Sequence, residues 1–333
     1  MKHFVIVLAV LLATTAMGQD VFEKVGTSGA HFLDISVDAA VKGMGDAYAA
    51  QTLDHAGAIH YNPATLVYID GWSAQFNSVQ YLADINLIAG GVAYNMGALG
   101  TFGVGYRSLN SGDIEETTVT AQNGTGNTYT WNDLALGLSY ARSFTDNFSF
   151  GVNLNYVNEA VSAYDLKASA WSADLGTYYQ TQFKSLRLGM TIRNFGPEID
   201  FNTSFIDYNN GEEVPERESY RPFPMPLTFQ VGVAYDLIEG VGAHRLTVAA
   251  DAVHSNDSAE RLNVGLEYQF ANMLNLRGGF YTNHNSASIM DGSLMGGLGL
   301  NLNVGGFNPR FDYSVANYTL LGMIHQFSIT ISG

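Results

Sequence analysis

Few residues of this chain have the types and the spacing that chemistry requires. His55 and His60 are five residues apart, and no carboxylate stands at metal-ligand spacing beside them, so they predict no metal site. The Gly-rich stretches at residues 100–105 and 296–299 open no helix, and a phosphate-binding loop needs a helix N-terminus. The sequence has no Cys and no G-x-S-x-G motif, which excludes thiol nucleophiles and the commonest serine nucleophile. We therefore predict no catalytic residue, no cofactor, no metal and no enzymatic activity.

Composition and charge narrow the class of protein further. Only 14% of the residues are charged, against about 25% in ordinary soluble domains. The formal net charge is −16, which argues against nucleic acid as a partner and against docking on an acidic membrane surface.

The N-terminal residues predict export. Lys2 and His3 precede an apolar run from Phe4 to Ala13, and small residues follow at Ala16 and Gly18. This is the pattern of a secretory signal peptide over residues 1–18, cleaved before Gln19. A membrane-spanning helix is the alternative, but it needs about 20 apolar residues, more than this run offers.

Alternation of apolar with small or polar residues dominates the chain from Trp72 onward. In Leu134-Ala-Leu-Gly-Leu-Ser-Tyr140 every second residue is large and apolar, and the pattern returns at residues 150–156, 229–235, 262–268 and 298–304. A period of two places the apolar side chains on one face of a strand. Two classes fit this pattern: a large secreted β-domain, and a transmembrane barrel in which alternation dilutes the apolar residues.

Tyrosines favour the barrel over the soluble sandwich. Most alternating segments carry one at the end of the apolar series: Tyr94, Tyr106, Tyr140, Tyr156, Tyr235 and Tyr268. A phenolic ring suits a bilayer interface, where its body is buried and its hydroxyl is wet. A sandwich also places Tyr at strand ends, so it is the repetition that favours the membrane.

The spacing of the segments predicts fourteen strands, an even number as in single-chain bacterial barrels. We expect them at residues 72–82, 85–95, 98–109, 129–144, 147–161, 168–183, 186–195, 226–238, 244–254, 260–271, 273–283, 294–304, 307–317 and 323–332. Tight links follow the second, fourth, sixth, tenth and twelfth strands, whereas the links after the third and seventh, Asn110–Thr128 and Gly196–Met225, are long. Short periplasmic turns that alternate with longer external loops indicate an outer-membrane barrel.

The fold class is therefore predicted as all-β: a transmembrane antiparallel β-barrel of about fourteen strands, integral to a Gram-negative-type outer membrane and surrounded by its lipid. Residues 71–333 form this barrel. Residues 19–70 lack the alternation, and the luminal positions of the strands are mostly Gly, Ala, Ser and Asn, too small to fill a barrel this wide. We predict that residues 19–70 fold inside the lumen as a plug, with a short helix or turn from Ala56 that ends at Asn62-Pro63.

Two motifs in this plug resemble the N-terminus of the PorV/PorQ family, which is related to the FadL-type fatty-acid transporters. The first is Gly43-Met-Gly-Asp-Ala47, and the second is Tyr61-Asn-Pro-Ala64 followed by Leu66. Asp46 stands where Gly is commoner, and His60 and Thr65 replace the usual aromatic residue and Gly. The resemblance implies a fourteen-strand barrel with an N-terminal hatch, and it leaves two functions open.

The first function is that of PorV-like members, accessory barrels of type IX secretion that receive cargo proteins after translocation. It implies secreted cargo and other secretion-system subunits as partners, besides the barrel-assembly machinery that every such barrel meets. The alternative is that of FadL-like members, which pass hydrophobic small molecules such as long-chain fatty acids through the lumen. The long acidic loop favours the first, because an exposed loop of this size is a plausible partner surface.

Two sets of residues are candidate sites. The plug set is predicted to bind a ligand or to gate its passage. Two alternatives stay open: Asn62-Pro63 only sets a turn, and Gly43 and Gly45 only let the backbone pass the barrel wall. The set comprises Gly43, Met44, Gly45, Tyr48, Ile59, Tyr61, Asn62, Pro63 and Leu66. The loop set is predicted to contact a partner and comprises Asp207, Tyr208, Glu212, Glu213, Glu216, Glu218 and Tyr220. The luminal charges Arg187, Arg193, Glu267 and Arg277 are expected to grip the plug or to line a path.

Overall fold

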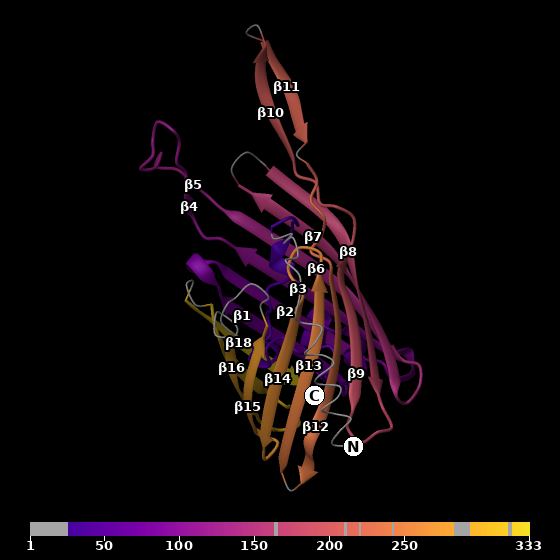
Figure 1. Cartoon of the computed structure of the whole chain (residues 1–333). Helices are drawn as coiled ribbons and strands as arrows, with labels where there is room; N and C mark the ends of the chain where they lie inside the picture. The colour runs from indigo at the N-terminus through magenta and orange to yellow at the C-terminus, as the bar shows by residue number, and fades with distance from the viewer. Residues whose placement is uncertain are drawn as a thin grey trace.

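The alternating segments pair with one another and close into a ring. The computed structural model describes residues 26–162, 166–209, 212–219, 221–241, 243–282, 294–318 and 322–333. In these ranges sixteen strands form one antiparallel sheet, which closes because β1 pairs with β18 and β8 pairs with β9. Two strands, β10 and β11, form a hairpin at one edge, so that fourteen strands make up the closed barrel (Figure 1).

All fourteen predicted barrel strands are confirmed, with small shifts at their ends. They are β1 (Trp72–Gln80), β2 (Asn86–Asn95), β3 (Thr101–Asn110), β6 (Trp131–Ser143), β7 (Phe148–Val161), β8 (Leu166–Gln180), β9 (Arg187–Phe195), β12 (Thr228–Val241), β13 (His244–Ser255), β14 (Arg261–Phe270), β15 (Leu274–Tyr281), β16 (Leu294–Asn301), β17 (Arg310–Asn317) and β18 (Met323–Ser332). The shift at the start of β3 arises because a 3-10 turn, η5 (Gly97–Leu99), occupies the residues before it.

The two ends of the barrel carry different connections, as predicted. Short links join β2 to β3, β6 to β7 and β14 to β15 at one end, here called the short-turn end. The opposite end, the long-loop end, holds a segment with the small strands β4 (Ile114–Glu115) and β5 (Thr128–Tyr129), and the short turn η4 (Leu82–Asp84). Residues 196–225, predicted as a long connection, contain β10 (Asn202–Asn209) and β11 (Glu212–Ser219), which form a β-hairpin that the sequence did not indicate.

The facing of the strands follows the alternation. Leu136 and Leu154 are 47% and 46% exposed on the outer face, whereas the Asn153 side chain is 2% exposed on the luminal face. This confirms an apolar outer surface around a polar and small-residue lumen. The tyrosines do not form one row: Tyr94 and Tyr140 flank Phe102, whereas Tyr106 lies in a second row nearer the long-loop end. In the described ranges, no helix has the length and apolar character needed to cross a bilayer.

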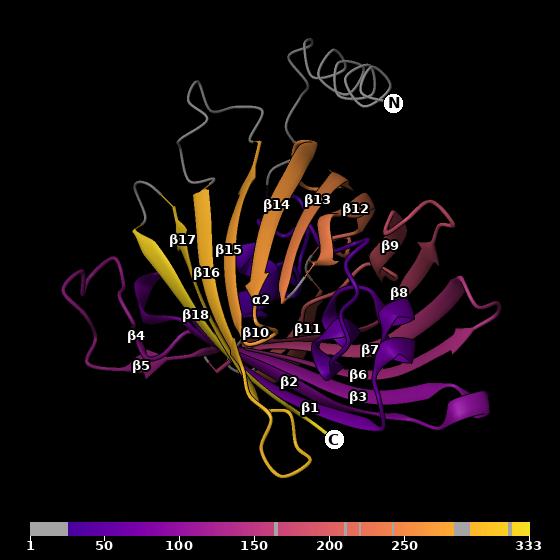
Figure 2. The same cartoon turned by 90° about the horizontal axis from the view of Figure 1, so that it is seen from below.

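The described residues 26–70 lie inside the ring of strands, as the view along the barrel shows (Figure 2). They form η1 (His31–Leu33), the short helix α2 (Ala39–Gly43), η2 (Ala56–His60) and η3 (Pro63–Tyr68). The helix or turn expected to end at Asn62-Pro63 is thus two 3-10 helices, since Asn62 caps the second of them. Residues 1–25 lie outside the described ranges, and the signal peptide over residues 1–18 stays a prediction.

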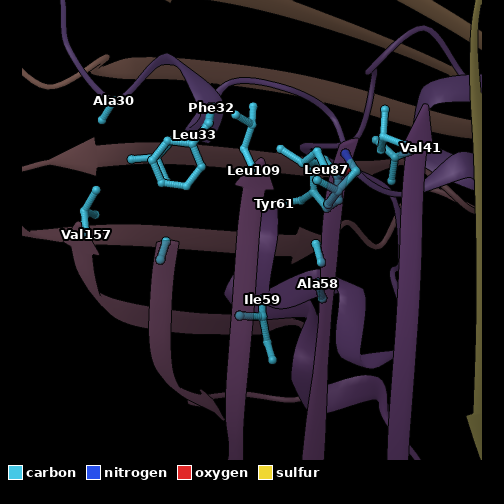
Figure 3. Packing of buried hydrophobic residues seen from close by; sticks show 14 of the residues in the cluster. Ala30, Phe32, Leu33, Val41, Ala58, Ile59, Tyr61, Leu87, Leu109 and Val157 are labelled. Atoms are coloured by element: carbon cyan, nitrogen blue, oxygen red, sulfur yellow. The ribbon is translucent and has the colours of Figure 1, made fainter. Parts of the chain in front are cut away.

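The plug crosses the barrel from end to end. The backbone N–H of Gly29 donates to the carbonyl of Pro224 (3.0 Å), close to where the β10–β11 hairpin leaves the barrel. The carbonyl of Ile69 accepts from the Asn95 side chain (2.8 Å) at the short-turn end, just before β1 begins. An apolar cluster with Ile59 and Tyr61 at its centre packs between the plug and the wall (Figure 3).

Candidate functional site

Glycines of the barrel wall form the surface on which the plug backbone rests. A Cβ added to Gly151 would lie 2.3 Å from the carbonyl carbon of Pro63, and one added to Gly176 would lie 2.1 Å from Asn62 Oδ1. Real Cβ atoms essentially never approach so closely. The alternating Gly positions therefore serve close backbone approach, a role that Gly fills because it has no side chain.

The same kind of contact recurs around the ring. Met44 and Gly45 lie against Gly265 and Gly279, with added Cβ atoms at 2.3 Å from the Met44 carbonyl oxygen and 2.2 Å from the Gly45 nitrogen. The Ile59 side chain fits against three further wall glycines: Gly91, Gly103 and Gly105. The Gly-rich stretch at residues 100–105 is thus in part a docking surface for the plug.

The Gly43-Met-Gly-Asp-Ala47 motif forms a turn that follows α2. Gly45 has φ +65° and Asp46 has φ +58°, a left-handed conformation that favours Gly and tolerates Asp. This accounts for the preference for Gly at position 46. The Asp46 carboxylate pairs with Lys42 Nζ (2.8 Å), whose side chain is 5% exposed. Asp46 thus accepts a conformation suited to Gly and neutralises a buried lysine.

Tyr61 holds the start of α2 in place. Its hydroxyl accepts hydrogen bonds from the backbone N–H groups of Val37 (2.9 Å) and Asp38 (2.8 Å). Asp38 is in turn the N-cap of α2, since its Oδ1 accepts from Ala40 N (2.7 Å), and Gln75 Nε2 of β1 donates to its Oδ2 (2.7 Å). A buried polar network of this kind is stabilising only when its members are satisfied.

Asn62 and Pro63 connect three elements. The Asn62 side-chain amide donates to the Ala49 carbonyl (2.8 Å) and to the Thr177 carbonyl of β8 (3.1 Å), while its Oδ1 accepts from Ala64 N (3.1 Å). Pro63 stands at the first position of η3, where its missing N–H costs no hydrogen bond. These contacts account for the Asn-Pro pair structurally, and its predicted gating role stays a prediction.

A second polar network ties the plug to β12–β14. Asp251 Oδ2 accepts from Ala49 N (2.8 Å) and from Gln230 Nε2 (2.6 Å). Gln230 Nε2 and Asn263 Nδ2 both donate to the Asp46 carbonyl, at 3.0 and 2.9 Å. The luminal side chains of Gln230, Asn263 and Asp251 therefore bind plug backbone.

The two plug histidines are structural in geometry. His55 is 2% exposed, and its Nδ1 accepts from Gly57 N (3.1 Å). Burial, together with the positive charge of Arg310, lowers the pKa of His55 to about 3, so the ring is neutral. His60 Nε2 lies 3.3 Å from the Gly90 carbonyl. Within the described ranges, no three His, Asp or Glu side chains come together as a metal site would require.

A large cavity lies at the long-loop end, here called the outer cavity. Its volume is about 820 Å³. Apolar and aromatic residues of the plug, the wall and the loops form much of its lining, among them Phe32, Ile35, Leu109, Trp131, Phe201 and Phe223. Two carboxylates also line it, Asp133 and Glu159, which stand opposite each other on β6 and β7.

A smaller, polar cavity lies at the short-turn end, here called the inner cavity. Its volume is about 240 Å³, and four arginines line it: Arg187, Arg245, Arg277 and Arg310. Ala40 lines the inner cavity, whereas Lys42 and Asp46 line the outer one. Helix α2 and the turn that follows it therefore separate the two cavities.

Of the predicted luminal charges, only Arg193 reaches the plug directly. Its guanidinium lies 3.6 Å from Asp34 and donates to the His60 carbonyl (3.4 Å). Arg187 and Arg277 instead pair with wall carboxylates. Sequence reasoning missed Arg107, which donates to the carbonyls of Phe32 and Leu33; its position in the alternation of β3 was the only available signal.

The structure brings the predicted plug set together and places the loop set elsewhere. Met44, Tyr48, Ile59, Tyr61 and Leu66 are each at most 2% exposed and are packed among the plug and the wall. None of them lines the outer cavity. In the loop set, Asp207 and Tyr208 lie on β10, and Glu212, Glu213, Glu216 and Glu218 lie on β11; Tyr220 lies outside the described ranges. The roles of both sets stay predictions.

Several solved outer-membrane proteins share this fold. The toluene transporter TbuX of Ralstonia pickettii aligns with a TM-score of 0.59 at 15% identity, over 88% of this chain and 96% of that one. The toluene transporter TodX of Pseudomonas putida aligns with a TM-score of 0.59 at 14% identity, over 90% and 98%. A FadL homologue of Pseudomonas aeruginosa aligns with a TM-score of 0.55 at 12% identity, over 89% and 98%. At these identities the likeness concerns the fold alone.

The sequence itself identifies the family. No curated protein matches the chain, but the family described as type IX secretion system protein PorV matches residues 18–238. This match includes the plug with both of its motifs and continues through the barrel into β12. It spans well over half of the sequence, and this outer-membrane β-barrel belongs to the PorV family.

Proposed function

We propose that this chain is a non-enzymatic accessory barrel of type IX secretion that receives cargo proteins at the long-loop end. The observation that carries the proposal is the PorV family match over residues 18–238. The match includes the plug motifs Gly43–Ala47 and Tyr61–Leu66, which hold the plug in the lumen, so it covers the part of the molecule that distinguishes this barrel from an open pore.

The closed lumen supports a receiving role. The plug is fixed to the wall through Asp251, Asn62 and the glycine contacts described above. A barrel closed in this way offers its rim and loops to a polypeptide rather than its lumen. Cargo would therefore meet the protein from outside after crossing the membrane elsewhere.

The β10–β11 hairpin supports a partner surface at that rim. It projects beyond the barrel at the long-loop end (Figure 1). Its base is tied to the barrel by the pairing of Asn202 with Lys167 and by the bridge between Ile199 and Phe223. Four of the acidic residues predicted as a partner surface, Glu212, Glu213, Glu216 and Glu218, belong to β11, and Asp207 belongs to β10. A projecting strand edge also provides backbone donors and acceptors that another chain can pair with.

The direct test is to delete the gene for this protein from its host and to restore the gene on a plasmid. Secreted proteins that depend on type IX secretion should leave the cell surface in the deletion strain and accumulate in the periplasm. Restoration should return them to the surface. Normal surface display in the deletion strain would refute the proposal.

Transport of hydrophobic small molecules is the second candidate, and the outer cavity favours it. Its volume of about 820 Å³ lies in the range of about 300–1,000 Å³ that small-molecule sites occupy. Phe32, Leu109 and Phe201 give it apolar walls. Two of the proteins that share this fold, TbuX and TodX, are toluene transporters. Uptake of a long-chain fatty acid or an aromatic hydrocarbon by the same deletion strain tests this alternative, which predicts lost uptake with normal cargo display.

A further inference from the structure

The inner cavity concentrates positive charge in an acidic protein. The chain has 15 Lys and Arg residues and a formal net charge of −16, yet four arginines line this one cavity of about 240 Å³: Arg187, Arg245, Arg277 and Arg310. Arg187, Arg245 and Arg310 lie at the starts of β9, β13 and β17, at the short-turn end, and Arg277 lies in the middle of β15. The cavity therefore faces the periplasmic mouth of the barrel.

Two of the four arginines make close ion pairs with wall carboxylates, although Arg187 Nε makes no hydrogen bond among the described residues. Arg277 lies 2.6 Å from both Glu267 and Asp312, and its side chain is 4% exposed. Arg187 lies 2.5 Å from Asp236. These close pairs hold the wall strands together and leave the two cations little capacity for another anion.

The other two arginines have N–H groups left for a further anion. Arg245 is 43% exposed and approaches Glu267 only to 3.9 Å. Arg310 Nε lies 3.1 Å from Asp312 of the wall, but its Nη1 lies 3.5 Å from Asp54 of the plug, and its Nη2 makes no hydrogen bond among the described residues. Guanidinium groups bind carboxylate or phosphate best through two parallel N–H···O bonds, and neither Arg245 nor Arg310 makes two such bonds to one carboxylate.

Asp54 is suited to be displaced. Its side chain is 61% exposed, although its neighbours Leu53 and His55 are buried at 5% and 2%. An exposed ion pair contributes little to stability. The remainder of the plug is held by contacts that do not involve Asp54, such as those of Asp251 and Asn62.

We propose that the inner cavity binds a small oxyanion, a phosphate or a carboxylate free in the periplasm, through Arg245 and Arg310, and that Asp54 is its built-in competitor. The cavity of about 240 Å³ has room for an anion of the size of phosphate or citrate, and Asp54 and Arg310 also line an adjoining hollow of about 630 Å³. It opens inside the barrel, which keeps it from the lipid face. Binding of the anion releases Asp54 from Arg310 and loosens residues 51–55 of the plug.

Binding can be measured with the purified full-length protein in detergent, by calorimetric titration at constant ionic strength. Inorganic phosphate and citrate are the two oxyanion probes, and chloride is the control. We expect at least one oxyanion to bind and Arg245→Gln to weaken it roughly tenfold or more, a loss of one strong charged contact. Asp54→Asn should tighten binding. Arg142→Gln is the matched control, because Arg142 is exposed on β6 and does not line the cavity.

Release of the plug segment has its own readout. The chain has no Cys, so Leu53→Cys places a single thiol at a buried position next to Asp54. Its labelling by a water-soluble maleimide should accelerate when the oxyanion is added, and should be fast without any anion when Asp54→Asn is combined with it. Heat-modifiability on gels shows that each variant is folded. Oxyanion binding equal to that of chloride, or unchanged in Arg245→Gln, would show that the arginines only brace the wall and would overturn the proposal.

Discussion

Gly151 of β7 lies directly against the backbone of Pro63, so closely that an added Cβ would stand 2.3 Å from the Pro63 carbonyl carbon. The plug thus rests on a wall position that admits no side chain. The contact links a luminal glycine of the alternating pattern to the Asn-Pro motif of the plug.

Gly151→Val should therefore prevent η3 from docking against β7. The barrel should still close, since Val is a good strand residue. We expect a rise in ion conductance across planar bilayers. Gly278→Val is the matched control, because Gly278 has no heavy atom within 4 Å of its added Cβ. A folded, heat-modifiable Gly151→Val protein with the conductance of the Gly278→Val control would contradict the docking role.

Tyr61→Phe removes the acceptor of the Val37 and Asp38 N–H groups, both in the plug interior. Leaving buried donors unsatisfied costs about 1–3 kcal/mol, so amide exchange at these two residues should accelerate accordingly. Tyr48→Phe is the control, since the buried Tyr48 hydroxyl has no hydrogen-bond partner among the described residues. Its removal should be neutral or slightly stabilising. Equal effects of the two substitutions would show that the Tyr61 hydroxyl does not anchor α2.

Asp46→Gly separates backbone conformation from charge. Gly relaxes the left-handed position, but Lys42 then loses its ion-pair partner inside the protein. Breaking a buried pair from one side costs about 3–5 kcal/mol, so the substitution should destabilise. The double variant Lys42→Met with Asp46→Gly should recover most of that loss, as a double-mutant cycle of refolding free energies would show. Additive effects would mean that the pair contributes nothing.

An arginine introduced on the outer face of the barrel tests whether this face contacts lipid. Leu154→Arg should lower the refolding free energy in lipid vesicles by about 2–4 kcal/mol, because the guanidinium would meet hydrocarbon. Phe144→Arg, in the turn between β6 and β7 where Phe144 is 64% exposed, should cost only about 0–1 kcal/mol, as expected near an interface. Equal free-energy costs of Leu154→Arg and Phe144→Arg would show that the Leu154 face does not contact the membrane.

The strands could be predicted from the sequence because alternation acts locally: each segment shows its two faces within a few residues. The plug contacts could not, since Gly151 and Pro63 meet only after the barrel has closed. The β10–β11 hairpin escaped prediction because Glu212–Ser219 is mostly charged, contains a Pro and shows no alternation of apolar and polar residues. The cavities also lay beyond the sequence, as Arg245 and Arg310 come from strands far apart in the chain.

Position 46 shows a different limit of prediction from the sequence. The sequence motif indicated that Gly is commoner there, but only the positive φ of Asp46 gives the reason, and only the fold places Lys42 beside its carboxylate. The plug set was predicted as a possible ligand pocket on the strength of apolar side chains such as Met44 and Leu66. In the structure these side chains are packed, and the larger cavity is lined by residues for which the sequence gave no signal.

The central claim is that the protein receives secreted cargo at its outer rim, and deletion of residues 207–219 from the β10–β11 hairpin tests it most directly. Removal of residues 116–127, between β4 and β5 at the same end, is the matched control. Tyr61→Ala serves as the plug variant, and all three are assayed for surface display of cargo and for uptake of a long-chain fatty acid. We predict that the hairpin deletion alone abolishes cargo display and leaves uptake unchanged. Normal display after the hairpin deletion, with uptake lost only in Tyr61→Ala, would contradict the account and favour a transporter.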